Sequence, residues 1–467
     1  MSETLAIAIT LVVYKLALVG IGLVANRRTK DAADFFLGGR GLGPWVAAIS
    51  ASASSSSAWT LLGVSGAAYA WGLGALWILP ACIGGFLVNW IVLAPRLRRL
   101  SLAEGSLTVT DVLAGPVGSP GSTAIRRLCT AIVLVSLLAY VAAQFQGAGK
   151  TFHQTFDMSM PAAVLLGGGI VVLYTLLGGF WAVSITDTLQ GLVMAAAAVI
   201  VPVVAVVEVG GPVALMDALG QVDAAGYGSW VGGRALAPAL GFVLGLLGIG
   251  LGYPGQPHVV NRFMAVRDET SLRRARTIAI GWAIVMYTGM LVVGWCARVL
   301  LPELADKEVA FIEVTRQLLS PVVAGVMIAA VLSAVMSTAD SQLLVAASSV
   351  AHDLRRHERP GGVSLLRTRG VVLALSALAV GLALWGSQEI FSRVLFAWTA
   401  MGAAFGPLLL VRVVAGRVRP RARLASIGLG FGLSVLAYSI EGLAGGPWER
   451  VVPFIVAYVV AWRGREH

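Results

Sequence analysis

The sequence predicts an all-α protein that crosses a membrane many times. Of its 467 residues, 58% are hydrophobic and only 12% are charged, and the mean hydropathy is +0.85. Soluble globular chains carry roughly 25% charged residues, so this composition excludes a soluble fold. The 56 glycines agree with this, since Gly is frequent in membrane helices that pack closely. All three cysteines lie in apolar runs, and we therefore expect no disulfide framework.

Runs of about 20 apolar residues mark spanning helices. We expect thirteen, at residues 4–25, 45–66, 73–94, 128–149, 161–181, 184–208, 236–257, 277–300, 316–350, 370–386, 391–414, 424–440 and 451–462. The ninth run is long enough to extend past the membrane or to bend. Lys15, in the first run, is expected to extend its ammonium toward the membrane surface.

The basic residues indicate the orientation. With the amino terminus outside the cell, most of the 34 Lys and Arg residues fall in cytoplasmic loops, and Arg262 is counted among them. This asymmetry satisfies the positive-inside rule, and an odd number of spans then places the carboxyl terminus inside. The net charge of +11 is therefore a topology signal, and we expect no binding of nucleic acid.

We expect residues 1–467 to form a single membrane transport domain. Its predicted parts are an extra first helix and loop (1–44), two blocks of five helices (45–208 and 236–414) and two C-terminal helices (415–467). The polar stretches between spans are too short to form a separate soluble domain.

Two of the spans carry residues that break a helix. The span 45–66 has a serine-rich centre from Ser50 to Ser57. The span 236–257 contains Gly245, Gly248, Gly250 and Gly252 and then ends in Tyr-Pro-Gly-Gln-Pro. Each Gly costs about 1 kcal/mol and each Pro about 3 kcal/mol inside a helix. Each break opens a five-helix block, and the two blocks start from opposite sides of the membrane. This pattern is typical of inverted-repeat secondary transporters, whose unwound backbone lines a cavity. Close packing of unbroken helices is the alternative.

A polar stripe lies within the apolar segment 331–351. Ala334, Ser337, Thr338 and Ser341 are spaced so that they share one face of a helix. Hydroxyl and carboxylate oxygens are the ligands that a hard cation prefers. The alternative is that the hydroxyls bond back to carbonyls of their own helix. Asp340 favours a cation-binding role for this stripe. A carboxylate at the bilayer centre costs roughly 2.5–3.5 kcal/mol, and residues that are so costly to bury are usually functional.

A second intramembrane carboxylate, Asp187, follows the sequence GGFWAVSIT. It is either functional or an ordinary acidic residue near a helix N-terminus, where the dipole favours negative charge. The five histidines lie in loops or at helix ends without metal-ligand spacing, and no catalytic triad is indicated, so the sequence predicts no enzyme.

Over nearly its whole length, the chain resembles the sodium/solute symporters, most closely the sodium/proline symporter branch. The residues that carry the resemblance are DFFLGGRGLGP (34–44), ASASSSSAW (51–59), GGFWAVSITDTLQ (178–190), GYPGQPHVVNRFMA (252–265), FIEV (311–314), AAVLSAVMSTADSQLLVAASS (329–349) and GAAFGP (402–407). The resemblance implies a leucine-transporter-type core of five plus five inverted helices with flanking helices.

The resemblance also implies a set of binding residues. The main sodium site would use backbone oxygens of Ala53, Ser56 and Ala334 and the hydroxyls of Ser337 and Thr338. A second cation, known from sialic-acid-transporting relatives, would lie near Asp187, Ser337, Asp340 and Ser341. The substrate would contact Ser57, Tyr140, Tyr253 and Pro257.

The chain departs from the proline branch at several pocket positions. It has Ser55 where proline members typically have Asp, Ala58 where they have Gly, and Ile249 where they have Trp. We hypothesise that Asp340 supplies the negative charge absent at Ser55. If so, Asp340→Asn lowers the affinity for sodium.

The resulting expectation is a multi-pass protein of the cell (inner) membrane that imports a small organic solute by alternating access, with Na⁺ as the coupling ion. Proline is the best single expectation for the solute. The alternatives are another amino acid or organic acid, proton coupling through Asp187 and Asp340, or a transporter-like solute sensor without its own output domain. Sodium, the solute and the lipid bilayer are the expected partners, and a monomer is the expected functional unit.

Overall fold

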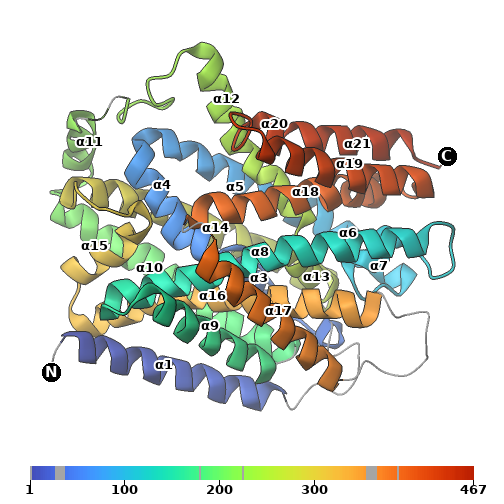
Figure 1. The fold of residues 1–467 in the computed structure, drawn as a ribbon, viewed down its shortest axis with the longest axis horizontal. Helices are drawn as coiled ribbons and strands as arrows, with labels where there is room; N and C mark the ends of the chain where they lie inside the picture. The colour runs from blue at the N-terminus through green and yellow to red at the C-terminus, as the bar shows by residue number, and fades with distance from the viewer. Residues whose placement is uncertain are drawn as a thin grey trace.

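The computed structural model describes residues 3–26, 37–177, 180–222, 224, 226–353, 365–386 and 389–466. Within these ranges the chain is helical throughout, and its only strand-like pairings are two isolated bridges, Leu42–Val266 and Val418–Arg465. The helices run roughly parallel or antiparallel along the long axis, and α1 begins at one end of the bundle while α21 ends at the other (Figure 1).

The first part of the described chain contains nine α-helices and several short helical turns. They are α1 (Glu3–Asn26), η1 (Gly38–Arg40), α3 (Pro44–Ser55), η2 (Trp59–Gly63), α4 (Val64–Trp71), η3 (Gly72–Trp77), α5 (Ile78–Leu87), η4 (Val88–Leu93), α6 (Ala94–Glu104), α7 (Val109–Ala114), α8 (Ser122–Phe156), α9 (Met160–Leu177) and α10 (Phe180–Glu208). The chain turns between α4 and α5 at Gly72, whose φ of 57° is a conformation that L side chains rarely adopt. A Cβ there would also strike the Tyr227 backbone oxygen.

The second part repeats the alternation of long and interrupted helices. It comprises α11 (Pro212–Gln221), α12 (Leu236–Leu247), η5 (Gly248–Gly255), α13 (Pro257–Met264), α14 (Glu269–Leu300), η6 (Lys307–Val309), α15 (Ala310–Leu318), α16 (Pro321–Ser348), η7 (Ser349–Asp353), α17 (Leu365–Trp385), α18 (Ile390–Ala415), α19 (Pro420–Ser439), α20 (Pro447–Arg450) and α21 (Val452–Arg463). Asp268 caps α14 by accepting a hydrogen bond from the Ser271 amide at 2.7 Å. This bond and the Arg267 guanidinium lower the pKa of Asp268 to about 2.

Nine described segments are long and apolar enough to span a membrane. They are Thr4–Ile21, Trp59–Glu104, Ser122–Phe156, Phe180–Glu208, Leu236–Gly255, Glu269–Leu300, Pro321–Ala351, Ile390–Ala415 and Pro420–Ser439, and two shorter apolar helices cover Met160–Leu176 and Arg369–Trp385. The multi-pass helical architecture is therefore confirmed. The count of thirteen spans and their orientation remain predictions.

The ninth predicted span is divided. α15 ends at Leu318, Leu319 is extended (φ −111°, ψ 149°), and Pro321 begins α16. The prediction of one helix over 316–350 is wrong, although the bend anticipated in it is present. The cause is Pro321, which lacks a backbone N–H and is tolerated only in the first turn of a helix.

Both predicted breaks are confirmed. α3 ends at Ser55 and Ser56 leaves the helical conformation (φ −113°, ψ 86°). In the second broken span, the tight helix η5 ends at Gly255, Gln256 is extended (φ −94°, ψ 99°), and Pro257 begins α13. The alternative of two unbroken, closely packed helices is excluded.

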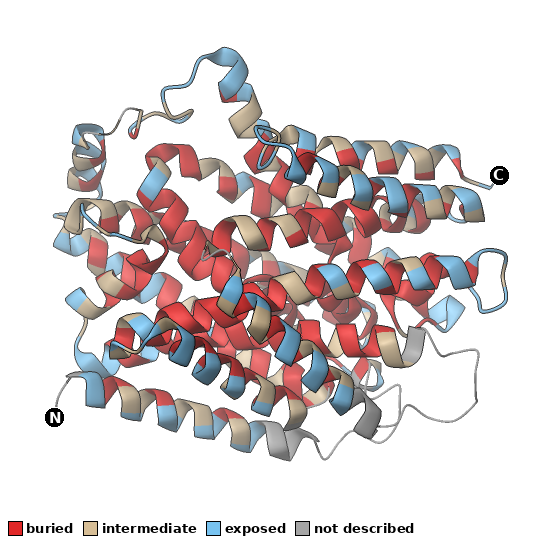
Figure 2. Cartoon of the chain, in the orientation of Figure 1, coloured by how far each residue is buried: buried red, intermediate tan, exposed pale blue. Residues whose placement is uncertain are grey.

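The α16 helix forms the centre of the bundle. It packs against α1, α3, α8 and α10, and 83% of its most apolar window is buried, compared with 22% for α1. Figure 2 shows this gradient from a buried centre to exposed outer helices. The hydroxyl stripe of α16 thus faces protein on all sides and not lipid.

Candidate cation and solute site

The first break exposes backbone oxygens in the protein interior. Every residue from Ser50 to Ser57 is buried. Because the helix stops at Ser55, the Ala53 carbonyl oxygen accepts a tightened bond from the Ser56 amide at 3.1 Å. Gln144 on α8 supports the far side of the break, where its Oε1 accepts from the Ala58 amide at 3.0 Å. The break is therefore held in place by both the main chain and a neighbouring helix.

The hydroxyl stripe of α16 meets this break directly. The Ser337 hydroxyl lies 3.3 Å from the carbonyl oxygens of both Ala53 and Ala334, and the Thr338 hydroxyl donates to the Ser54 carbonyl at 3.2 Å. Ser337 and Thr338 have no exposed surface. The hydroxyls thus do not bond solely to their own helix, as the alternative interpretation would require.

These oxygens fit a monovalent cation such as sodium. Carbonyl and hydroxyl oxygens from two helices converge in a dry region, and they are hard ligands without competing nitrogen or sulfur. The Ser56 hydroxyl adjoins them, is buried, and has no hydrogen-bond partner. A buried polar atom without a partner is uncommon and calls for a ligand or water.

Asp187 lies in a second polar cluster beside the first. Its Oδ2 accepts hydrogen bonds from the hydroxyls of Ser50 and Ser54, both at 3.1 Å, and forms an ion pair with Arg262 at 2.6 Å. Both charged side chains are buried, with 0% and 2% of their surface exposed. Asp187 lies more than one turn inside α10, so the alternative of an acidic residue at the helix N-terminus is excluded.

Arg262 is among the largest fully buried side chains of the described residues, and the sequence analysis did not identify it as a candidate site residue. The prediction that it belongs to a cytoplasmic loop is wrong, because it lies on α13 and is fully buried. The signal was present in the sequence: Pro257 can begin a helix, and a helix from Pro257 carries Arg262 away from the loop that follows Met264.

Asp340 lies on the same helix as Ser341 but faces a different neighbour. Its Oδ1 accepts from the Ser341 amide at 2.6 Å, while its Oδ2 is buried and has no hydrogen-bond partner. Lys15 on α1 places its ammonium 2.6 Å from the Met336 sulfur, one helical turn from Asp340, and the two charges interact. The prediction that Lys15 extends to the membrane surface is therefore wrong.

Two of the four expected solute residues, Ser57 and Tyr140, are in direct contact. The Tyr140 hydroxyl donates to the Ser57 hydroxyl at 3.2 Å. Pro257 begins α13, and the adjacent His258 ring lies edge-on to Tyr140 with centroids 6.1 Å apart. Tyr253, in the second break, contacts other residues. Its hydroxyl bonds that of Tyr287 at 2.7 Å, and its ring packs against Trp398 with centroids 4.7 Å apart.

Side chains from α18, from η4 and from the break itself satisfy the backbone of the second break. Trp398 donates to the Ile249 carbonyl at 3.1 Å, Asn89 to the Tyr253 carbonyl at 3.2 Å, and Gln256 to the Gly252 carbonyl at 3.0 Å. α18 approaches so closely that a Cβ on Gly255 would lie 2.6 Å from the Gly402 Cα. The unwound segment is thereby fixed without regular helical bonds.

Buried polar atoms without partners gather around the two breaks. They are Ser56 Oγ, Trp59 Nε1, Thr60 Oγ1, Asn89 Oδ1, Gln144 Nε2, Gln256 Oε1, both ring nitrogens of His258 and Thr399 Oγ1. Such atoms are costly to bury unless something bonds them. A polar ligand bound near the breaks could bond these atoms.

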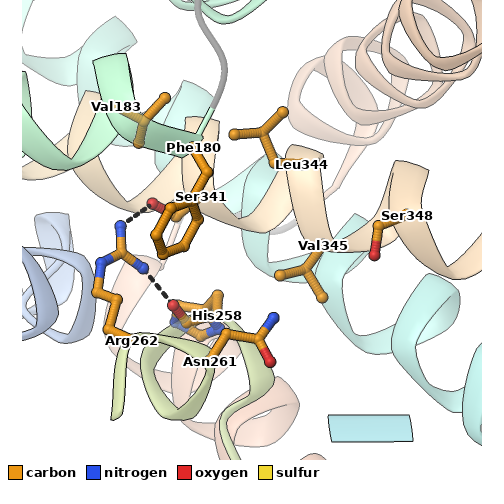
Figure 3. Close-up of a pocket in the computed structure, with 9 residues that line it drawn as sticks. All are labelled: Phe180, Val183, His258, Asn261, Arg262, Ser341, Leu344, Val345 and Ser348. Carbon is orange, nitrogen blue, oxygen red and sulfur yellow. Dashed lines mark hydrogen bonds between the residues drawn. The ribbon is translucent and has the colours of Figure 1, made fainter. Parts of the chain in front are cut away.

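A small cavity of about 30 Å³ lies next to the Asp187–Arg262 pair. It is lined by Phe180, Val183, His258, Asn261, Arg262, Ser341, Leu344, Val345 and Ser348. Figure 3 shows the Arg262 guanidinium between the Ser341 hydroxyl and the His258 carbonyl at the wall of this cavity.

Comparisons with known proteins agree with this architecture. A family model described as "Sodium:solute symporter family" matches residues 35–430. The chain is 34% identical to the osmoregulated proline transporter OpuE of Bacillus subtilis, covering 98% of this chain and 94% of that protein. It is also 34% identical to a sodium/proline symporter of Escherichia coli, covering 94% and 88%, respectively.

Solved structures share the fold at low sequence identity. The substrate-bound, outward-open state of a Na⁺-coupled sialic acid symporter superposes with a TM-score of 0.80 at 16% identity, covering 98% of this chain and 97% of that one. Mhp1, a nucleobase-cation-symport-1 family transporter, superposes with a TM-score of 0.60 at 15% identity, covering 94% and 93%.

Proposed function

The chain belongs to the sodium:solute symporter family, and from this membership we propose that it imports proline together with sodium. It is a sodium-coupled transporter of the cell membrane and not an enzyme. Proline is the proposed solute because relatives that match nearly the whole chain are named as proline transporters. The departures at Ser55, Ala58 and Ile249 leave the pocket's selectivity to be tested.

The observation that supports the proposal is the contact between the Ser337 hydroxyl and the Ala53 carbonyl oxygen. The Ser337 hydroxyl on α16 lies 3.3 Å from the Ala53 carbonyl in the last turn of α3, beside the break. We assign the main sodium site to the backbone oxygens of Ala53, Ser56 and Ala334 and to the hydroxyls of Ser337 and Thr338. Because the site needs both helices, bound sodium would hold α3 against α16 and stabilise one state of the transporter.

The solute would bind between the two breaks. Ser57 and Tyr140, whose hydroxyls are hydrogen-bonded to each other, would offer polar contacts, and Pro257 at the start of α13 would contribute its ring. Tyr253 would contribute from the second break, with its hydroxyl fixed by Tyr287. A solute with a carboxylate and an ammonium, such as proline, could bond the partnerless polar atoms found in this region.

We further propose that the two blocks, 45–208 and 236–414, form inverted repeats that rock against each other around this site. The extra helix (1–44) and the C-terminal helices (415–467) would flank them. The monomer would be the functional unit within the lipid bilayer, with the amino terminus outside and the carboxyl terminus inside.

The test is solute uptake by the purified protein in proteoliposomes. Radiolabelled proline should accumulate when an inward sodium gradient is imposed, and not when sodium is replaced by potassium at fixed pH. Competition by a panel of amino and organic acids then measures selectivity. Sodium-driven uptake of another solute in preference to proline would overturn the substrate assignment. Sodium-independent uptake driven by a pH gradient would overturn the coupling ion, and binding without transport would indicate a sensor.

A further inference from the structure

Arginines gather at the turn between α18 and α19, which the residues after α21 cover. Val418 in this turn pairs with Arg465, and the Arg419 amide donates to the Gly464 carbonyl at 2.8 Å. The carboxyl terminus accordingly lies beside the ends of α19 and α21 (Figure 1). These backbone contacts bring together five arginines from two parts of the chain, which we call the arginine surface: Arg417, Arg419, Arg421, Arg463 and Arg465.

The protein does not neutralise the arginine surface. Four of its members are exposed, and Arg465 is half-buried. None of the five takes part in an ion pair within the described part of the chain. In the described segments 416–424 and 462–466, Glu466 is the only acidic residue. The surface therefore carries a large excess of positive charge.

The start of α19 adds to this positive charge. Arg419 is its N-cap and makes no capping bond with its side chain, Pro420 follows, and the first turn contains no acidic residue. A helix N-terminus carries about half an elementary positive charge, which acidic residues usually complement. α14 shows the usual arrangement, because Asp268 caps it and Glu269 lies in its first turn. α19 instead leaves its first amides open to an anion from outside the protein.

The arginine surface lies at the boundary of the membrane. α18 and α19 are both long and apolar enough to span it, so the turn between them lies at the level of the lipid headgroups. Tyr458 and Trp462 of α21 stack with ring centroids 5.8 Å apart, and the Arg465 guanidinium carbon lies 3.6 Å from the centre of the Trp462 ring. Tyr and Trp are typical of this level of the membrane. The anions closest to these arginines are therefore lipid phosphates.

We propose that the arginine surface and the first turn of α19 bind the headgroups of anionic phospholipids. Guanidinium groups form bidentate hydrogen bonds with phosphate oxygens, and clusters of basic residues beside a membrane attract anionic lipids. The partner is a lipid and not a soluble polyanion, because the aromatic residues and the two spans place the surface among headgroups. This surface is separate from the cation and solute site, and its binding of lipid does not depend on which solute is transported.

Lipid binding can be measured by native mass spectrometry of the full chain released from detergent. Phosphatidylglycerol and phosphatidylcholine with the same acyl chains are added separately at equal concentrations, so that only the headgroup differs. We expect phosphatidylglycerol to bind more tightly, and its affinity to fall as the ammonium acetate concentration rises, because salt screens exposed charges. Equal affinity for the two lipids, or an affinity for phosphatidylglycerol that does not change with salt, would overturn the proposal.

A triple variant locates the site. It removes three exposed charges and keeps the Arg419 and Arg465 contacts: Arg417→Gln, Arg421→Gln and Arg463→Gln. We expect its dissociation constant for phosphatidylglycerol to rise by roughly 10–100-fold. The matched control removes three charges close to the start of α14, where acidic residues complement the helix: Arg273→Gln, Arg274→Gln and Arg276→Gln. The control should bind phosphatidylglycerol as the wild type does. Equal losses in the two variants would mean that net charge alone attracts the lipid, and the assigned site would be wrong.

Competition with glycerol 3-phosphate separates a lipid from a free phosphate. We expect this headgroup fragment, at the concentration used for the lipid, to leave the binding of phosphatidylglycerol unchanged. Full competition would show that the surface binds soluble phosphates, which would overturn the lipid assignment. If the triple variant does not fold, Arg421→Gln and its control Arg274→Gln are compared in the same way, and equal affinities in these two would also contradict the proposal.

Discussion

The Ser337 hydroxyl lies 3.3 Å from the Ala53 carbonyl oxygen, although 284 residues separate them in the chain. Ala53 lies two residues before the end of α3 at the first break, and Ser337 lies in the middle of the deeply buried helix α16. Neither residue alone offers more than one oxygen to a cation. In the proposed sodium site both oxygens would bind the ion, so any motion of α3 relative to α16 would change the site.

Removing the Ser337 hydroxyl should weaken sodium binding more than solute binding. Ser337→Ala deletes one ligand, and bonds to charged groups contribute about 1.5–3 kcal/mol. We expect the sodium concentration for half-maximal proline uptake to rise by roughly 10–100-fold. Ser333→Ala is the matched control, because that hydroxyl bonds Ala329 and Tyr14 one turn away. Equal sodium dependence of the two variants would argue against a cation site at Ser337.

The close approach of η5 to α18 should make Gly402 intolerant of a side chain. A Cβ on Gly402 would lie 2.5 Å from the Gly252 Cα, which is backbone and cannot turn aside. We expect Gly402→Ala to lower the thermal unfolding midpoint and to reduce uptake. Gly432→Ala in α19 is the control, since no atom lies within 4 Å of its Cβ and Ala favours the helix by about 1 kcal/mol. A midpoint unchanged by Gly402→Ala would contradict this packing.

Features that depend on local chemistry could be predicted from the sequence. The breaks follow from Ser50–Ser57 and from the Gly- and Pro-rich run before Pro257, because helix propensity is a local property. The stripe of Ser337 and Thr338 follows from helical spacing. The partners of these groups could not be predicted in the same way, since helix spacing does not say which neighbour a face meets.

The long side chains show this limit most clearly. Lys15 and Arg262 were both assigned to polar surroundings, because a charge in a membrane protein is usually solvated. In the structure Lys15 turns inward to α16, and Arg262 pairs with Asp187 from a helix 75 residues away. Only the tertiary arrangement brings the compensating carboxylates within reach.

Lys15 and Asp340 should behave as a coupled pair. Asp340→Asn leaves the ammonium without its nearby negative charge, and Lys15→Met leaves a buried carboxylate uncompensated. We expect each single variant to lower the thermal unfolding midpoint and the double variant to recover part of the loss. A coupling free energy of roughly 0.5–3 kcal/mol is typical of residues that share such an interaction.

The same variants test whether Asp340 replaces the charge absent at Ser55. If its main role is to attract sodium, Asp340→Asn should raise the sodium concentration for half-maximal uptake, and adding Lys15→Met should not reverse the change. Lys15→Leu serves as a second neutral replacement, because it guards against an effect of the Met thioether. Additive stability changes in the double variant would show that the two charges do not interact.

Glu308 should be essential for stability because it joins three elements. Its Oε2 binds Lys150 of α8 at 2.6 Å and the Ile390 amide at 3.0 Å, while its Oε1 accepts from the Phe391 amide at 2.7 Å. It thereby caps the start of α18, whose first amides have no partner within the helix. Only 1% of its side chain is exposed, and removing one partner of a buried ion pair costs about 3–5 kcal/mol.

Glu308→Gln should therefore unfold at a markedly lower temperature than the wild type, as measured by thermal unfolding in detergent. It keeps the shape of the side chain but removes the charge, and its amide nitrogen would face a backbone donor at α18. Asp306→Asn is the matched control, because Asp306 binds the same Lys150 at 2.6 Å from a position that is 42% exposed. Exposed pairs contribute only about 0–1 kcal/mol, so this variant should stay close to wild type. Equal destabilisation by the two variants would mean that burial does not set the strength of the Glu308 contact.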